Sequence, residues 1–291
     1  MIPGFGKEEE SALETLNGMV GVDQMREVYQ QCLALAKCSV ENPELKKIRK
    51  SMIFTGNPGT GKSTCAGIIS RALIEAGLCT SSMVTATRSD IIGQFVGHTS
   101  PKVKKLFNQA RNGILFVDEA DFFLNKDSGG YVLEGLKEFV RYIEMYPDVT
   151  VIFAMYEKSV QAFYDLDAGL RSRIAGKCYF ADYDDQQMCQ ILKNMLKKYK
   201  LSLVKGYKEI LIPYIQKIRN SENFGNAREM RNVADMAIKI HCMNHSEGKT
   251  KDKNVISLDE LKTAIDRLTP ISAQKERRVA GFNSCWSNVT V

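Results

Sequence analysis

Five short apolar runs, each rich in strand-forming residues, alternate with amphipathic helical stretches over residues 52–180 of the chain. None of the runs alternates apolar with polar residues, so each is expected to be buried on both faces. Buried strands separated by helices are typical of a parallel sheet with helices on both sides. We therefore predict an α/β domain with strands at 52–55, 83–86, 114–117, 149–154 and 178–180.

After Asp182 the spacing of apolar residues becomes helical throughout, and a capping box formed by Ser257 and Glu260 opens the last helix. In that helix we expect Leu258 to be buried together with Leu261. The sequence thus predicts three parts. They are an N-terminal segment plus the α/β domain over 1–181, a small all-helical domain over 182–270, and a C-terminal tail over 271–291.

Composition restricts the classes of protein to which the chain can belong. Of 291 residues, 40 are Lys or Arg and 34 are Asp or Glu, and the formal charge of +6 is spread over many segments. This permits an anionic ligand without indicating nucleic acid. No apolar run reaches the roughly 18 residues of a membrane span, and the start "MIPGFGKEEE" has no signal-peptide pattern. We therefore expect no membrane partner. The eight cysteines form no C-x-x-C pair, so we expect free thiols in the cytoplasm.

The segment "GNPGTGKS", residues 56–63, directly follows the first predicted strand and precedes a helical stretch. This is the context that a phosphate-binding loop requires, because glycines let backbone N–H groups approach phosphates at a helix N-terminus. Lys62 is expected to reach the β and γ phosphates, and Ser63 to bind Mg²⁺. The residues assigned to this site are Asn57, Pro58, Gly59, Thr60, Gly61, Lys62, Ser63 and Thr64.

Three carboxylates follow the third predicted strand in "ILFVDEADFF", residues 114–123. An unpaired buried charge is very costly, so carboxylates at a strand end indicate solvent or a cation. We interpret the cation as the Mg²⁺ of a nucleoside triphosphate, oriented by Asp118 through water. Glu119 is then the base that polarises the attacking water. Asp121 is expected to cap the segment that follows.

Five segments in order resemble the AAA+ ATPases, in particular the group that contains the red-type Rubisco activase CbbX and the stage V sporulation protein K. They are "FTGNPGTGKST", "SDIIGQFVGHTSPK", "GILFVDEAD", "GLRSRIAGKCYFADY" and "FGNAREMRN", and the likeness extends from about residue 16 to about residue 240. The resemblance implies a P-loop NTPase α/β/α domain followed by a helical lid. It also implies ATP and Mg²⁺ as ligands, a homo-oligomeric, hexameric ring, and a protein substrate.

The same resemblance assigns further site residues. Val20 and Gly21 match the segment that contacts the adenine, with an ordinary helix entry as the alternative. Phe95, Val96 and Gly97 fall where the family carries its pore loop, whose aromatic side chain grips a polypeptide in the centre of the ring. An aromatic residue before glycine is otherwise more often part of a core.

Four arginines and one tyrosine complete the set that the resemblance implies. Arg173 matches the arginine finger that a neighbouring subunit supplies, and Arg171 is a second candidate. Arg228 matches the second sensor, with Arg231 one helical turn further. Tyr156 occupies the first-sensor position, where many relatives carry Asn or Thr.

Three classes of function compete on this sequence. The leading one is a ring motor that hydrolyses ATP and remodels a protein. The second is a nucleotide-gated scaffold with slow turnover and no threading, against which the intact Glu119 and Arg173 argue. The third is a nucleic-acid motor, which the absence of a basic stripe with interleaved aromatics disfavours. The substrate stays open between Rubisco, a sporulation protein and another protein.

Overall fold

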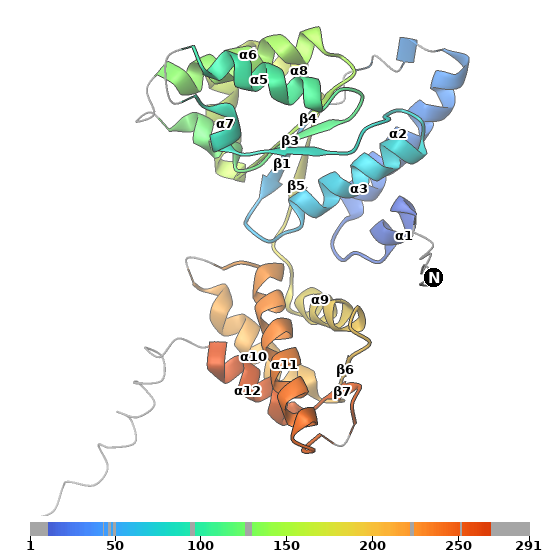
Figure 1. The fold of residues 1–291 in the computed structure, drawn as a ribbon, viewed down its shortest axis with the longest axis vertical. Helices are drawn as coiled ribbons and strands as arrows, with labels where there is room; N and C mark the ends of the chain where they lie inside the picture. Colours follow the sequence, from blue (N-terminus) through green and yellow to red (C-terminus); the bar gives the residue numbers. More distant parts are fainter. Residues whose placement is uncertain are drawn as a thin grey trace, which may run out of the picture. The chain divides into compact units, whose positions relative to one another are not determined.

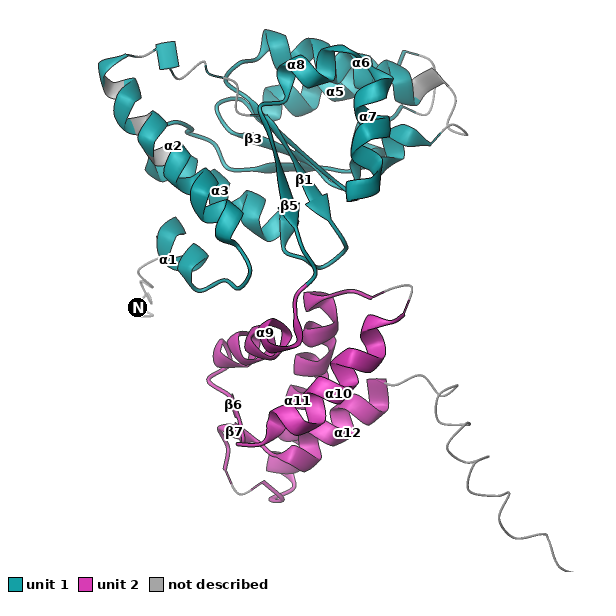
Figure 2. Cartoon of the chain, turned by 180° about the vertical axis from the view of Figure 1, so that it is seen from behind, with its two compact units in different colours: residues 1–182 teal, residues 183–291 magenta. Residues whose placement is uncertain are grey.

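The computed structural model describes residues 11–42, 44–45, 48, 51–93, 97–125, 130–221, 224–250 and 252–268. The chain divides into two compact units, Met1–Asp182 and Tyr183–Val291, and each is described by itself (Figure 2). The first unit is an α/β sandwich and the second is a group of helices (Figure 1). Within the described part of the chain, no helix combines the length and apolar character that crossing a membrane requires.

The sheet of the first unit has five parallel strands in the order β2-β3-β4-β1-β5. The predicted α/β class with a parallel sheet is confirmed, and every predicted strand is present with ends that differ by at most two residues. The strands are β1 (Met52–Gly56), β2 (Val84–Ala86), β3 (Ile114–Val117), β4 (Thr150–Met155) and β5 (Gly176–Phe180).

The order of the strands places β1 between β4 and β5. From β1 the chain passes to β2 at the far edge, returns through β3 and β4, and then crosses to β5 on the other side. Ligands of open parallel sheets bind beyond the carboxyl ends of the strands, where neighbouring connections leave in opposite directions. The loop that follows β1 lies at this point of the fold.

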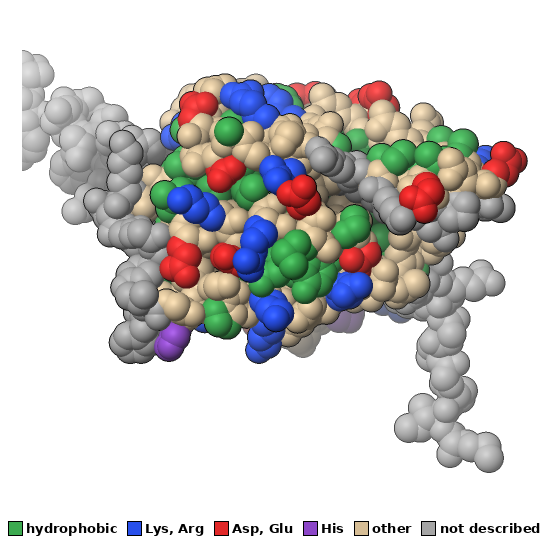
Figure 3. All heavy atoms as spheres, turned by 90° about the horizontal axis from the view of Figure 1, so that it is seen from above, with side chains coloured by type: hydrophobic (Ala, Val, Ile, Leu, Met, Phe, Trp, Pro, Cys, Tyr) green, Lys and Arg blue, Asp and Glu red, His purple; other side chains and the backbone are tan. Residues whose placement is uncertain are grey.

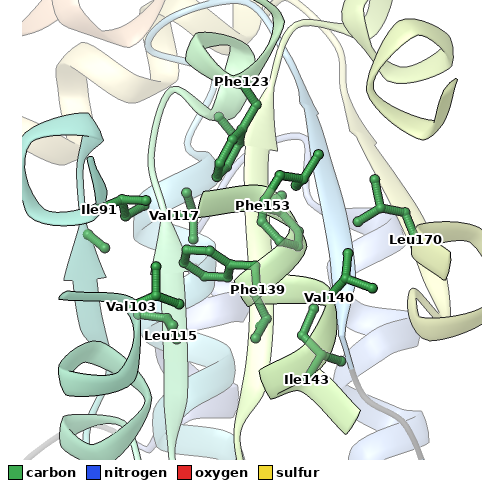
Figure 4. Packing of buried hydrophobic residues seen from close by; sticks show 14 of the residues in the cluster. Ile91, Val103, Leu115, Val117, Phe123, Phe139, Val140, Ile143, Phe153 and Leu170 are labelled. Carbon is green, nitrogen blue, oxygen red and sulfur yellow. The ribbon is translucent and has the colours of Figure 1, made fainter. Parts of the chain in front are cut away.

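Helices cover both faces of the sheet (Figure 1). Successive residues of the inner strands face opposite sides, and both sides are buried. Ile53 packs with α5 and α6 residues in one core, whereas Phe54 packs with α1 to α3 residues in the other. Figure 4 shows the first core, with Phe139 and Phe153 at its centre. The helices are α1 (Ala12–Asn17), α2 (Asp23–Glu41), α3 (Lys62–Glu75), α4 (Arg88–Ile91), α5 (Thr99–Gln109), α6 (Gly130–Met145), α7 (Val160–Leu166) and α8 (Gly169–Arg173).

Two 3-10 segments lie at the carboxyl edge of the sheet. The segment η2 (Ala120–Leu124) follows β3, and η4 (Glu157–Ser159) follows β4. Both begin within three residues of a strand end, so they determine where the polar residues after these strands lie.

The second unit packs four helices around one apolar core, as the helical spacing predicted. The capping box is present, since Glu260 N donates to Ser257 Oγ (3.3 Å) and Ser257 N donates to Glu260 Oε2 (2.9 Å). The expectation that Leu258 is buried is wrong, because it is 37 % exposed, and Glu260 takes the buried position of that first turn. The elements are α9 (Asp185–Lys197), α10 (Tyr207–Arg219), α11 (Ala227–Ser246), α12 (Leu258–Leu268), and the short parallel pair β6 (Ser202–Leu203) and β7 (Val255–Ile256).

Candidate nucleotide-binding site

The loop after β1 has a backbone that only glycine adopts without strain. Gly56, Gly59 and Gly61 have φ of 142°, 73° and 97°. A Cβ on Gly56 would also lie 2.2 Å from the carbonyl oxygen of Phe180, the last residue of the neighbouring strand β5. The first glycine therefore lets the loop leave the sheet in close contact with β5, and the other two let it turn back into α3.

Lys62 holds its ammonium group over this loop. Its Nζ donates to the carbonyl oxygens of Gly56 and Asn57, both at 2.8 Å. The hydroxyl of Thr60 donates to the same Asn57 carbonyl at 2.8 Å, and this hydrogen bond within the loop stabilises its turn. The positive charge of Lys62 is thereby placed within the turn and not out in solvent.

The N-terminus of α3 suits an anion. Its N-cap, Gly61, provides no side-chain hydrogen bond to the first turn, and that turn contains no acidic residue. Helix first-turn N–H groups have no acceptor within the helix, so they are donors for a bound phosphate. Ser63 and Thr64, the second and third helical residues, are exposed at this end. The residues present therefore fit the triphosphate, and the Ser63 hydroxyl offers an oxygen ligand of the kind that Mg²⁺ prefers.

The end of β3 turns sharply out of the sheet at two acidic residues. Asp118 is half-buried, its N–H donates to Ala86 O (2.9 Å), and its Oδ1 accepts from the N–H of Glu119 at 3.0 Å. Glu119 is exposed and adopts the left-handed conformation, with φ 51° and ψ 41°. This conformation costs a non-glycine residue on the order of 1 kcal/mol or more and is concentrated at functional sites. It releases Glu119 from the pleat of the strand.

Asp121, which follows β3, is hydrogen-bonded to the backbone at the end of β4. Both of its carboxylate oxygens lie 3.2 Å from the backbone N of Tyr156, which donates to them. The expectation that Asp121 caps the next segment is wrong, because the order of the strands brings β4 beside β3 and offers it a better donor. Tyr156 itself is 40 % exposed, with the Lys158 ammonium 5.6 Å from its ring centroid.

The register of the sheet brings these groups to one edge. Thr55 pairs with Met155, and Val117 pairs with Phe153. The glycine loop, Asp118 and Tyr156 therefore all follow strand residues at the carboxyl edge of three adjacent strands.

The loop between α1 and α2 carries Val20, which is half-buried, and Gly21, which is exposed with φ 69°. Gln24, in the first turn of α2, accepts a hydrogen bond from the N–H of Tyr179 on β5 at 2.9 Å. This bond anchors the loop beside the strand that pairs with β1. Sequence reasoning missed Gln24, since a glutamine early in a helix has no distinguishing signal.

Asn57 also forms hydrogen bonds with a residue that follows the carboxyl end of β5. Its Nδ2 donates to both carboxylate oxygens of Asp182, at 3.0 and 2.9 Å. Asp182 is the last residue of the first unit, so the glycine loop is hydrogen-bonded to the point where the chain leaves that unit. Nothing in the sequence pairs these two residues, which are 125 positions apart.

The two finger candidates lie on α8, at the opposite edge of the sheet. The N–H of Ala175 donates to the carbonyl of Ser51 at 2.7 Å, which places the end of α8 beside the amino end of β1. The strand has five residues at about 3.3 Å each, so Arg173 is roughly a strand length from the glycine loop of its own chain. Arg171 lies on the same helix, with 56 % of its side chain exposed and its guanidinium 4.7 Å from the Tyr164 ring centroid.

In the second unit, Arg228 and Arg231 lie in the first turns of α11 and are both exposed. The turn before this helix is fixed by Asn226, which is fully buried and accepts from the N–H of Tyr183 at 3.1 Å. A cation is unfavourable at a helix N-terminus, where the dipole is already positive, and Glu229 in the same turn of α11 supplies a negative charge that offsets this. Phe95 and Val96 lie outside the described residues, and the following Gly97 is exposed with φ 80°.

Comparison with known protein families agrees with this geometry. Residues 52–181 match the ATPase family associated with various cellular activities (AAA), and residues 184–270 match the AAA lid domain. The first match begins at the first residue of β1 and contains all five strands of the parallel sheet. The second contains the four helices that the structure describes in the second unit.

Several curated proteins are similar to this chain. A CfxQ homologue of Cyanidium caldarium is 35 % identical over 189 residues, which are 64 % of this chain and 66 % of that protein. The CbbX protein of Cereibacter sphaeroides is 36 % identical over 64 % of this chain and 61 % of its own length. A chloroplastic ribulose bisphosphate carboxylase/oxygenase activase of Cyanidioschyzon merolae is 36 % identical over 222 residues, which are 74 % of this chain and 71 % of that protein. In the first two, the matched part spans slightly less than two thirds of the relative.

Proposed function

Because the chain belongs to the AAA family of ATPases, in the group of the CbbX, CfxQ and Rubisco activase relatives, we propose that it is a Mg²⁺-dependent, ATP-hydrolysing ring motor that remodels a protein substrate. One observation carries the proposal. The glycine loop and the acidic strand end share one edge of the sheet, whereas the arginine finger candidates lie at the other edge.

Each residue of the site has a role that its position supports. Lys62 and the first-turn N–H groups of α3 bind the phosphates, with the loop glycines allowing the approach. Ser63 and Asp118 hold Mg²⁺, the first directly and the second through water; when bound, the ion neutralises charge on the β and γ phosphates. Glu119, released from the pleat, accepts a proton from the attacking water. Tyr156 stands beside them with its hydroxyl as a hydrogen-bond donor to a water or phosphate oxygen.

The separation of the finger candidates from the loop supports an oligomer. Arg173 lies at the amino edge of the sheet, about one strand length from the glycine loop of its own chain. It can therefore reach a triphosphate only if that triphosphate is bound to the loop of another copy of the chain. We assign this role to Arg173, with Arg171 as the second candidate. Hydrolysis then depends on a head-to-tail ring, hexameric by analogy with the family. On the second-sensor motif alone, we assign Arg228 to the γ-phosphate, with Arg231 acting beside it or at the subunit interface.

We place the pore loop at Phe95, Val96 and Gly97, on the strength of the motif alone. Relatives that are named activases of ribulose bisphosphate carboxylase/oxygenase support a folded protein as the class of substrate. On the face of the first unit seen in Figure 3, Lys and Arg are interspersed with Asp and Glu and form no basic stripe, which supports a protein over a nucleic acid. Six cysteines fall among the side chains that the structure describes, and all six are free thiols, which suits the cytoplasm.

Mixed rings test the proposal. We expect Arg173→Ala to lose about 10³-fold or more in ATP hydrolysis and Lys62→Ala to be equally inactive, each as a homo-oligomer. When the two variants are mixed, a ring with head-to-tail contacts regains activity at about a quarter of its interfaces, where an intact pocket meets an intact finger. Phosphate release measured across mixing ratios reports this recovery.

The matched control is Arg171→Ala, which removes the same charge from the same helix. Recovery with Arg171→Ala in place of Arg173→Ala would reassign the finger, and no recovery with either would exclude action between subunits. Phe95→Ala should hydrolyse ATP at the parent rate in the same assay. Loss of substrate remodelling at that unchanged rate separates a threading motor from a nucleotide-gated scaffold.

A further inference from the structure

The guanidinium of Arg173 is seated against its own chain. Nη2 forms an ion pair with Glu144 Oε2, which comes from the last turn of α6, and Nη1 donates to the carbonyl of Gly169 at 3.1 Å. Nη1 also lies 3.5 Å from Ser172 Oγ. Only 21 % of the Arg173 side chain is exposed. Its Nε is buried, and the described residues provide no acceptor for it. Little of the donor fork therefore remains for a ligand.

The seat depends on a glycine. A Cβ added at Gly169 would lie 2.4 Å from Nη1 of Arg173 and 3.0 Å from Val140 Cγ1. The backbone of Gly169 is helical, so conformation alone does not require glycine there. The missing side chain instead makes room for the guanidinium and for Asp167 Oδ1, which would lie 2.9 Å from the same Cβ, and this accounts for the first residue of "GLRSR".

Glu144 is the more exposed partner of this ion pair. Its side chain is 64 % exposed, so a phosphate approaching the guanidinium from solvent meets this carboxylate, whose charge has the same sign. Because the Glu144 side of this ion pair is exposed, water and salt weaken the pair, so a triphosphate with its higher charge can replace the carboxylate. The ion pair therefore holds Arg173 without trapping it.

We propose that Glu144 is a positioning residue that keeps the arginine finger docked on its own subunit until the γ-phosphate of a neighbouring subunit takes its place. This inference rests on the proposed function, since it presupposes that Arg173 acts between subunits. In this role Glu144 competes with the γ-phosphate of the neighbouring subunit for the Arg173 guanidinium. Removing the carboxylate releases the finger and favours the catalytic interface.

The test is the ATPase rate per subunit, measured over a range of protein concentrations. We expect Glu144→Gln to raise this rate about two- to five-fold at low protein concentration, the size of effect that loss of one exposed ion pair produces. The control is Glu138→Gln, which removes the same charge from the same helix but frees Arg141, and its rate should stay within about two-fold of the parent. The double variant Glu144→Gln/Arg173→Ala should match Arg173→Ala, because the gain acts through the finger.

The salt dependence of the ATPase rate distinguishes this role of Glu144 from a merely structural one. The ratio of the Glu144→Gln rate to the parent rate should fall toward one between roughly 0.05 and 0.5 M salt, because screening weakens the ion pair in the parent. An unchanged or lowered rate in Glu144→Gln, a gain that persists without Arg173, or a ratio independent of salt would each overturn the proposal. If Arg173→Ala instead hydrolyses ATP like the parent, it is the proposed function that fails.

Discussion

Glu119 and Glu260 both lie at the start of a helical segment, yet the two carboxylates differ in exposure and in hydrogen bonding. Glu119 begins η2 in the α/β unit, where it is exposed and held in a left-handed conformation. Glu260 lies in the first turn of α12 in the helical unit, where it is 4 % exposed and fully hydrogen-bonded. A carboxylate that is exposed, with no hydrogen-bond or ion-pair partner among the described residues, is available for chemistry, whereas a buried and bonded one contributes to stability.

The partners of Glu260 form a buried network. Its Oε2 lies 3.1 Å from Nδ1 of His241, and its Oε1 accepts from Asn244 Nδ2 at 2.9 Å. Nε2 of His241 lies 3.1 Å from the carbonyl oxygen of Lys253. Because the carbonyl and the carboxylate are both acceptors, both ring nitrogens must donate. The network therefore favours the imidazolium form of His241, which links α11, the following loop and α12.

The pKa values follow from these contacts. Burial lowers the pKa of His241, but the Lys253 carbonyl, the Glu260 carboxylate and the charge of Asp252 together outweigh it and raise the pKa above its usual value. Burial likewise raises the pKa of Glu260, and hydrogen bonds from the Ser257 backbone, Asn244, His241 and the Ser257 hydroxyl outweigh this and lower it to about 2. Both shifts favour the charged pair.

The largest effect is expected at the exposed carboxylate. Glu119→Gln should lower ATP hydrolysis about 10²- to 10⁴-fold, because it removes the carboxylate that we propose as the general base. Nucleotide affinity and the free energy of unfolding should change little, since the side chain is exposed. Steady-state phosphate release and titration with a fluorescent nucleotide measure the two properties. Glu157→Gln, at the same edge of the sheet, is the control. Equal turnover by Glu119→Gln and the parent would show that another group activates the water.

The second effect tests the buried carboxylate. Glu260→Gln should lower the free energy of unfolding of the helical unit by about 3 kcal/mol, because it leaves the His241 imidazolium buried without its counter-charge. Urea denaturation followed by circular dichroism measures this loss. Glu247→Gln in the same unit is the control, since Glu247 pairs with Lys249 on the surface, and it should cost no more than about 1 kcal/mol. A neutral result for Glu260→Gln would mean that the network is not stabilising.

The smallest effect is a pH dependence confined to the helical unit. His241 has a raised pKa, so its contribution is complete below its unfolded pKa of about 6.5 and is lost as pH rises through the folded value. Glu260 has a lowered pKa, so its contribution is lost as pH falls from about 4.3 toward about 2. Urea midpoints should therefore decline on both sides of about pH 5 to 6. In His241→Asn the alkaline decline should disappear. If that decline persists, another group causes it.

Prediction from sequence was most reliable where a pattern is local. The strand, glycine loop and helix of "FTGNPGTGKST" follow one another directly, and the glycines, the lysine and the helix start each have a physical requirement at that spacing. The five strands were found because continuous apolar runs are buried on both faces of a parallel sheet. The capping box of α12 was found because Ser257 and Glu260 are three residues apart.

Prediction failed where the deciding partner is distant in sequence. Asp121 was expected to cap its own segment, but it bonds to Tyr156, which only the pairing of β3 with β4 brings near. Leu258 was expected in the core from its helical spacing, but the buried position in that turn belongs to Glu260. His241 was not singled out, because its partners lie 12 and 19 residues away.

By itself, the sequence determined that the chain has a glycine-rich loop between a strand and a helix, an acidic strand end and a helical region after the sheet, since local spacing dictates which backbone groups and faces are available. Only the tertiary structure decided that Arg173 lies on the opposite edge from its own loop, and that Glu144 and Gly169 form its seat. Those relations depend on the order in which strands pair and on which helix ends meet. Contacts between residues far apart in the chain are decided by packing, and no local pattern records them.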